Sequence, residues 1–106
     1  MPKYLIEASY TSQGVAGVAD KGGTARREAV EALIASMGGR LESFYFAFGD
    51  ADVYATAELP SEEAATALAL SINRSDATKI RTIVLLTPEQ VDAAAKMAPD
   101  YKPPGS

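Results

Sequence analysis

The feature that most constrains this chain is the order in which strand-like and helix-like segments follow one another. Four short segments have the alternation or composition of strands, and two longer ones place apolar residues at helical spacing. The predicted strands cover residues 3–10, 40–47, 52–58 and 79–86, and the predicted helices cover residues 25–37 and 62–73. The predicted order is therefore β-α-β-β-α-β.

Local signals predict where the helices begin. We expect Thr24 to cap the first long helix, and Thr11 or Ser12 to cap a short turn of helix before it. The sequence TPEQ at residues 87–90 has the pattern of a capping box with proline at the first helical position. It predicts a further helix that runs to about Ala98.

This order is that of the ferredoxin-like fold, a member of the α+β class. Right-handed crossovers place both long helices on one face of a four-stranded antiparallel sheet, and the C-terminal helix is an addition. A chain of 106 residues has the size of one domain. We expect residues 1–98 to form that domain and residues 99–106 to form a proline-rich tail.

A single layer of helices leaves the other face of the sheet uncovered. The apolar residues expected on that face are Leu5, Tyr54, and either Ile83 or Leu85. Single exposed apolar residues are common, but apolar residues on both faces of the first and fourth strands favour a second copy packed sheet against sheet. The sequence therefore predicts a homodimer or a higher homo-oligomer.

Composition and charge disfavour several kinds of partner. The net charge of −4 lacks the basic footprint that nucleic acid or an anionic membrane surface requires. No apolar run approaches the roughly 20 residues of a membrane span. We expect no nucleic-acid or membrane partner, and the absence of cysteine favours a cytoplasmic location.

The chain contains no histidine, no cysteine and no tryptophan. The commonest general base, the commonest thiol nucleophile and the soft metal ligands are therefore missing. No phosphate-binding loop, nucleophile elbow or EF-hand pattern occurs in the sequence. We expect no metal site and no cofactor, and the sequence leaves open whether the protein is an enzyme.

Several charged and aromatic residues are candidates to line a pocket between the sheet and the first long helix. These are Glu7, Tyr10, Arg26, Tyr45, Asp52, Tyr54 and Arg81. Arg26 or Arg81 can hold a carboxylate or enolate oxygen. Asp52 or Glu7 can act as a general base. The simpler interpretation is structural: the strand charges pair across the sheet, the tyrosines pack, and Arg26 extends to solvent.

Motifs spread over residues 3–97 resemble those of a known family. They are Thr11-Ser12-Gln13-Gly14, Arg26, Gly38-Gly39-Arg40-Leu41, the hairpin FYFAFGDADVY, Leu59-Pro60-Ser61 and Ile80-Arg81-Thr82. Together they resemble the GYD-domain family of small bacterial proteins, whose function is uncharacterised. The naming motif of that family, Gly-x-Tyr-Asp, is matched by Gly49 and Asp52, whereas Ala51 replaces the tyrosine.

The resemblance implies a place in the wider group of dimeric α/β-barrel proteins, in which two ferredoxin-like sheets stack and ligand pockets form between sheet and helices. That group includes quinone-forming monooxygenases, lactone isomerases, haem-binding enzymes and stress-response proteins. Haem members generally rely on an axial histidine, which this chain lacks.

Two hypotheses of function follow from the residues and the resemblance. The first is an oligomeric protein with a pocket for an aromatic, quinoid or carboxylate compound; its catalytic form, the alternative, is a cofactor-free monooxygenase or isomerase. The second is an oligomeric structural protein whose interface fills the space between the sheets.

Overall fold

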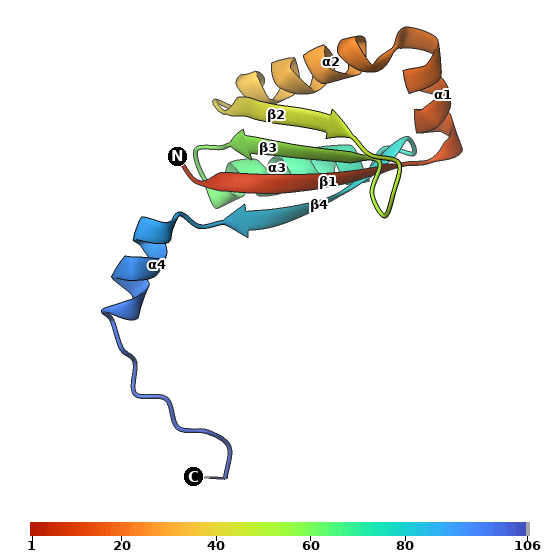
Figure 1. Cartoon of the computed structure of the whole chain (residues 1–106). Helices are drawn as coiled ribbons and strands as arrows, with labels where there is room; N and C mark the ends of the chain where they lie inside the picture. Colours follow the sequence, from red (N-terminus) through yellow and green to blue (C-terminus); the bar gives the residue numbers. More distant parts are fainter. Residues whose placement is uncertain (106) are drawn as a thin grey trace.

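The computed structural model describes residues 1–105 and consists of one antiparallel sheet, three helices packed around it and a helical C-terminal extension (Figure 1). The elements are β1 (Lys3–Tyr10), α1 (Ser12–Lys21), α2 (Gly23–Ser36), β2 (Arg40–Phe46), β3 (Val53–Glu58), α3 (Glu62–Asn73), β4 (Thr78–Leu85) and α4 (Pro88–Ala95). The strand order is β2-β3-β1-β4, with every pair antiparallel. This order confirms the predicted ferredoxin-like α+β fold.

The core lies between the sheet and helices α2 and α3. The alternating residues Tyr4, Ile6 and Ala8 of β1 are buried there, and so are Val53, Ala55 and Ala57 of β3. Ile34 of α2 and Leu59 after β3 have no exposed surface. Because strand side chains alternate between faces, the predicted pattern of β1 and β3 places these residues under the helices, as the structure confirms.

Three of the helix predictions differ from the structure. α2 begins at Gly23 rather than after Thr24, because the backbone of Gly22, at φ 90°, turns the chain and lets the helix start earlier. The short turn predicted after β1 is a ten-residue helix, α1, capped by the Thr11 side chain. α4 has the predicted capping box but ends at Ala95, before Ala98.

The face of the sheet opposite the helices is uncovered; we call it the open face. The register places Leu5 between Ile83 of β4 and Thr56 of β3 on this face. The side chain of Ile83 is 38% exposed. Among residues 1–105, no helix has both the length and the apolar composition that a membrane crossing requires.

Candidate functional site

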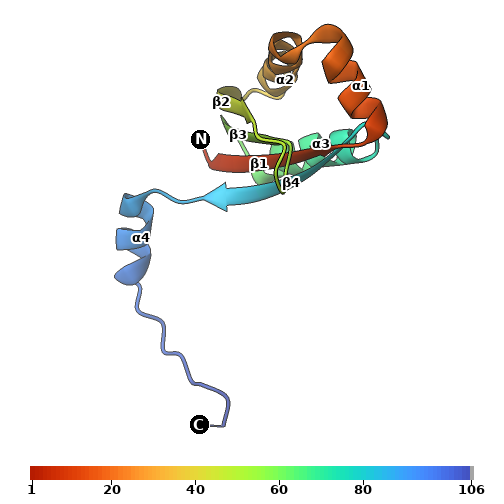
Figure 2. The ribbon, with the colours of Figure 1, turned by 45° about the vertical axis from the view of Figure 1, so that its right-hand side comes forward.

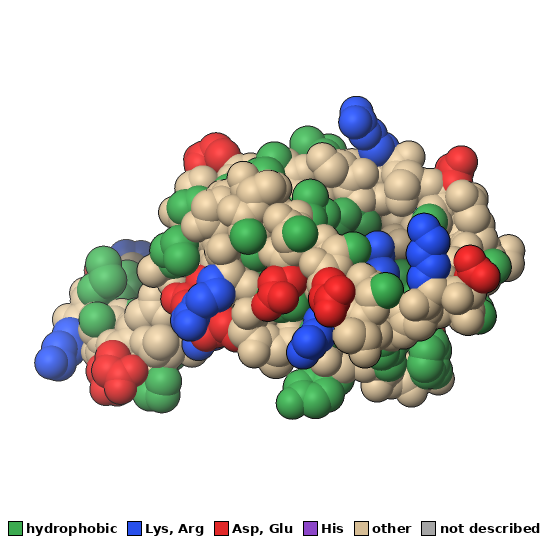
Figure 3. All heavy atoms as spheres, turned by 90° about the horizontal axis from the view of Figure 1, so that it is seen from above, with side chains coloured by type: hydrophobic (Ala, Val, Ile, Leu, Met, Phe, Trp, Pro, Cys, Tyr) green, Lys and Arg blue, Asp and Glu red, His purple; other side chains and the backbone are tan. Residues whose placement is uncertain are grey.

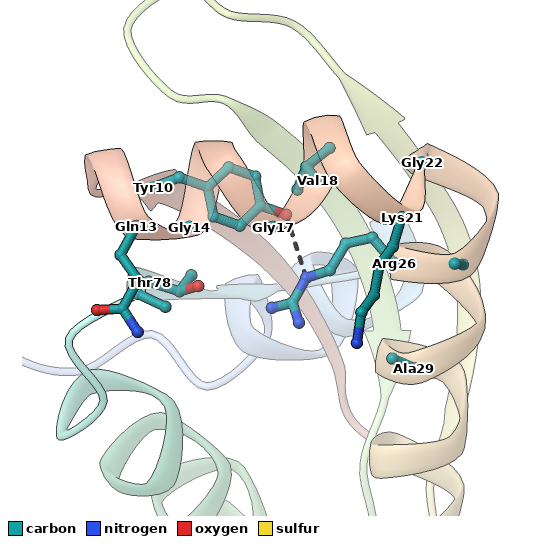
Figure 4. A pocket seen from close by; sticks show the side chains of 12 residues that line it. Tyr10, Gln13, Gly14, Gly17, Val18, Lys21, Gly22, Arg26, Ala29 and Thr78 are labelled. Atoms are coloured by element: carbon teal, nitrogen blue, oxygen red, sulfur yellow. Dashed lines mark hydrogen bonds between the residues drawn. The ribbon is translucent and has the colours of Figure 1, made fainter.

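A cleft of about 380 Å³ opens where α1 and the first turns of α2 meet the edge of the sheet (Figure 4). The lining residues come from β1, α1, α2 and the start of β4, and they include Tyr10, Gln13, Gly14, Gly17, Val18, Lys21, Arg26, Ala29 and Thr78. The volume lies at the lower end of the range for small-molecule pockets. The space-filling view from above shows basic side chains at a hollow on the side where α1 lies (Figure 3).

α1 is held against the sheet by contacts with residues far away in the sequence. The Thr11 N–H donates to the carbonyl oxygen of Ala77 at 3.0 Å, and the Thr11 hydroxyl donates to the carbonyl of Asp76 at 2.6 Å. A Cβ added at Gly14 would lie only 2.2 Å from the Ala77 carbonyl oxygen. Glycine is therefore needed at residue 14 because α1 touches the backbone before β4, and this contact forms one wall of the cleft.

Arg26 and Tyr10 form the polar centre of the cleft. The Arg26 Nε–H donates to the Tyr10 hydroxyl at 3.3 Å, and the guanidinium carbon lies 5.6 Å from the centre of the Tyr10 ring. This geometry fixes the guanidinium by one hydrogen bond and a cation–π contact. The N–H groups on its two terminal nitrogens stay available in the fork arrangement that matches a carboxylate.

The cleft has a positive electrostatic character. Lys21 extends into it beside Arg26 (Figure 4). All ion pairs found among the described residues lie elsewhere, and none includes Lys21 or Arg26. The C-terminus of α1 and the N-terminus of α2 meet at Gly22, so their opposite partial charges offset each other and the positive charge of the cleft comes from the two side chains.

The other candidate residues do not line this cleft. Asp52 Oδ2 accepts the Tyr10 N–H at 2.8 Å, so this carboxylate fastens the β2–β3 loop to the end of β1. Glu7, Tyr54 and Arg81 line a separate hollow of about 250 Å³ on the open face, and Tyr45 lies exposed across from Tyr54. Glu7 and Tyr10 are therefore separated, because odd and even residues of β1 point to opposite faces of the sheet.

The charges on the open face form exposed pairs. Arg81 Nη1 lies 3.9 Å from Glu7 Oε2, and the Arg81 side chain is largely in solvent. The hydrogen bond from Arg40 holds the pKa of the Glu58 carboxyl below its usual value, and the same pairing raises the pKa of Arg40. Within the part of the chain that the structure describes, no cluster of three carboxylates is placed to hold a metal ion.

Lys21 was not predicted as a site residue. The pattern that points to Lys21 is its spacing from other residues. Gly14, Gly17, Val18 and Lys21 lie at i, i+3, i+4 and i+7, which places them on one face of a helix. The signal becomes visible only if residues 12–21 form a full helix. Two glycines within the segment argue against that on propensity alone.

Comparison with known proteins gives one match. The sequence model of the GYD domain matches residues 4–95. The matched segment begins in β1 and ends in α4, so it contains every residue that lines the cleft. No curated protein and no solved structure shows a significant match to the chain.

Proposed function

The chain belongs to the GYD-domain family, and for this member we propose that the cleft between α1 and α2 binds a small aromatic carboxylate. The observation that supports the proposal most strongly is the pair of cations, Arg26 and Lys21, that face the cleft while every ion pair among residues 1–105 involves other side chains. An anionic ligand would pair with these two cations.

The chemistry of the walls favours an aromatic anion. A carboxylate would accept two parallel hydrogen bonds from the free edge of the Arg26 guanidinium, and Lys21 would add a second charge. The apolar lining residues Val18, Ala25 and Ala29 suit an aromatic ring next to the Tyr10 side chain. About 380 Å³ has room for a single substituted ring.

We propose binding rather than the catalytic alternative, a cofactor-free monooxygenase or isomerase. Such a reaction needs a group that accepts a proton from the substrate. None of the described residues that line the cleft is a carboxylate or histidine. Asp52, the candidate base, is bonded to the Tyr10 N–H instead.

Removal of either cation is expected to weaken binding of benzoate, the probe, by about tenfold or more, because a charge-assisted hydrogen bond contributes about 1.5–3 kcal/mol. Isothermal titration of Arg26→Met and Lys21→Met measures the change. Arg27→Met is the matched control, since Arg27 is exposed on α2 and does not line the cleft. Benzamide, which has the same shape without the charge, is expected to bind much more weakly. Equal binding of benzoate and benzamide would refute the proposal.

We also propose that the protein associates with itself through the open face. The support is the apolar corner, which we define as Leu5, Ile83 and Leu85, at one end of a face that no helix covers. Leu5 and Leu85 are half-buried and Ile83 is exposed, and adjoining apolar residues with part of their surface in solvent are typical of interfaces between copies.

Ile83→Lys is expected to shift the protein from dimer to monomer, because it places a charge within the proposed interface. Sedimentation velocity at fixed protein concentration measures the result. Leu70→Lys is the matched control, since Leu70 is 66% exposed on α3, away from the open face. A wild-type protein that is already monomeric, or a variant that remains fully dimeric, would count against the open face as the interface.

A further inference from the structure

Beyond β4 the chain forms an arm, residues 86–105, that extends away from the domain (Figures 1 and 2). No residue of α4 is buried. The large apolar residues of the arm are exposed, and they are Leu86, Val91, Met97 and Tyr101. An extension of this kind is unusual for an ordered segment, because it leaves apolar side chains in water and gains nothing from packing.

Local structure orders the start of the arm. Thr87 has extended backbone angles, φ −76° and ψ 157°, so the chain continues outward from β4 before the helix begins. The Thr87 Oγ1 accepts the Gln90 N–H at 3.1 Å, and the Gln90 side chain accepts the Thr87 N–H at 2.8 Å. This capping box ties the first turn of α4 to Thr87, so the helix and its cap form one ordered unit directly after β4.

The chain exposes more surface than a compact monomer of the same mass. The accessible surface is 7132 Å², whereas a compact monomer of 11.1 kDa is expected to expose about 5,700 Å². The radius of gyration is 17.0 Å, against about 13 Å for a compact chain of this length. The excess area of about 1,400 Å² exceeds the roughly 800 Å² that each partner buries in a stable dimer.

We propose that the arm packs on the apolar corner of a second copy of this chain. The inference rests on the proposed self-association and specifies what covers the corner. Val91, Ala94 and Ala95 lie at i, i+3 and i+4 of α4, which gives a narrow apolar face of small side chains.

The apolar corner lies next to the first residue of the arm, because Leu85 ends β4 and Leu86 starts the arm. With a two-fold axis near this point, the arm of each copy packs on the apolar corner of the other copy. The two equivalent contacts then form one symmetric interface.

Val91→Asp in the full chain is expected to raise the dimer dissociation constant at least about tenfold, equivalent to about 1.4 kcal/mol. Ala93→Asp is the matched control, because residue 93 lies on the other side of α4 and introduces the same charge. Sedimentation equilibrium gives both constants. Unchanged dimerisation of Val91→Asp alongside loss of dimerisation in Ile83→Lys would overturn the arm contact while leaving the open-face interface intact. A monomeric wild type would overturn both proposals.

Cross-linking gives a second readout that does not depend on stability. The chain has no cysteine, so introduced thiols are unique. One population carries Val91→Cys and a mass tag, and the other carries Ile83→Cys without a tag. Mild oxidation of the mixture is expected to give a mixed disulfide dimer, and Ala93→Cys in place of Val91→Cys is expected to give far less. Equal yields from residues 91 and 93 would contradict the proposed orientation of α4.

Discussion

Ile34→Ala is expected to lower the free energy of unfolding by about 2–5 kcal/mol, the range for truncating a buried isoleucine. Ile34 has no exposed surface and packs in the core between α2 and the sheet. Alanine there leaves a cavity as well as losing buried apolar area. A domain of this size has only about 5–15 kcal/mol of stability in total, so the loss is a large fraction of it.

Leu33→Ala is the matched control for Ile34, since the neighbouring residue of α2 loses side-chain atoms of similar size from a side chain that is 37% exposed. We expect its effect to be less than half as large. Urea unfolding at one protein concentration measures both variants, because self-association makes apparent stability depend on concentration. Equal losses for the two variants would mean that the core does not lie under the inner face of α2.

Gly14→Ala is expected to lower the free energy of unfolding by about 1–3 kcal/mol, the cost of forcing extra atoms into a packed contact. The new Cβ would lie 2.2 Å from the Ala77 carbonyl oxygen, and backbone must move to relieve the clash. α1 would then shift away from the start of β4. Because α1 forms one wall of the cleft, benzoate affinity is expected to fall in the same variant.

Gly17→Ala separates the contact at Gly14 from a general effect of glycine in α1. Apart from the backbone of its own helix and its chain neighbours, no atom lies within 4 Å of a Cβ added at Gly17. Since alanine favours a helix over glycine by up to about 1 kcal/mol, this variant is expected to be as stable as the wild type or more stable. Thermal unfolding followed by circular dichroism compares the two. Similar destabilisation by both substitutions would show that α1 is not held by the contact with Ala77.

The sequence allowed the sheet and its two covering helices to be predicted because alternation and helical periodicity are local patterns. The order of the elements then limited the topology, and the burial of Tyr4, Ile6 and Ala8 followed from their spacing. The start of α2 was misplaced because Gly22 allows a backbone turn that no side-chain pattern indicates.

The site was harder to predict because it depends on contacts between distant residues. α1 is a full helix although it contains Gly14 and Gly17, and its contacts with Asp76 and Ala77 join residues more than sixty positions apart. The candidate residues predicted from the sequence also come from both sides of the sheet. Tyr10 and Arg26 meet in the cleft, while Glu7 and Arg81 lie on the open face.

Ala51 is the residue at which the chain departs from the naming motif of its family. Its side chain is buried, and it lines the hollow on the open face next to Tyr54. The departure therefore affects the open face rather than the cleft that holds Arg26.

The most direct test of the cleft as a binding site is a titration of the ¹⁵N-labelled protein with benzoate, followed by amide and arginine side-chain NMR signals. We predict that the largest shifts occur at Gly14, Gly17 and Gly22 and at the Arg26 Nε–H, with little change along β2. Signals that stay unchanged at millimolar benzoate, or shifts confined to the open face around Arg81, would contradict the account.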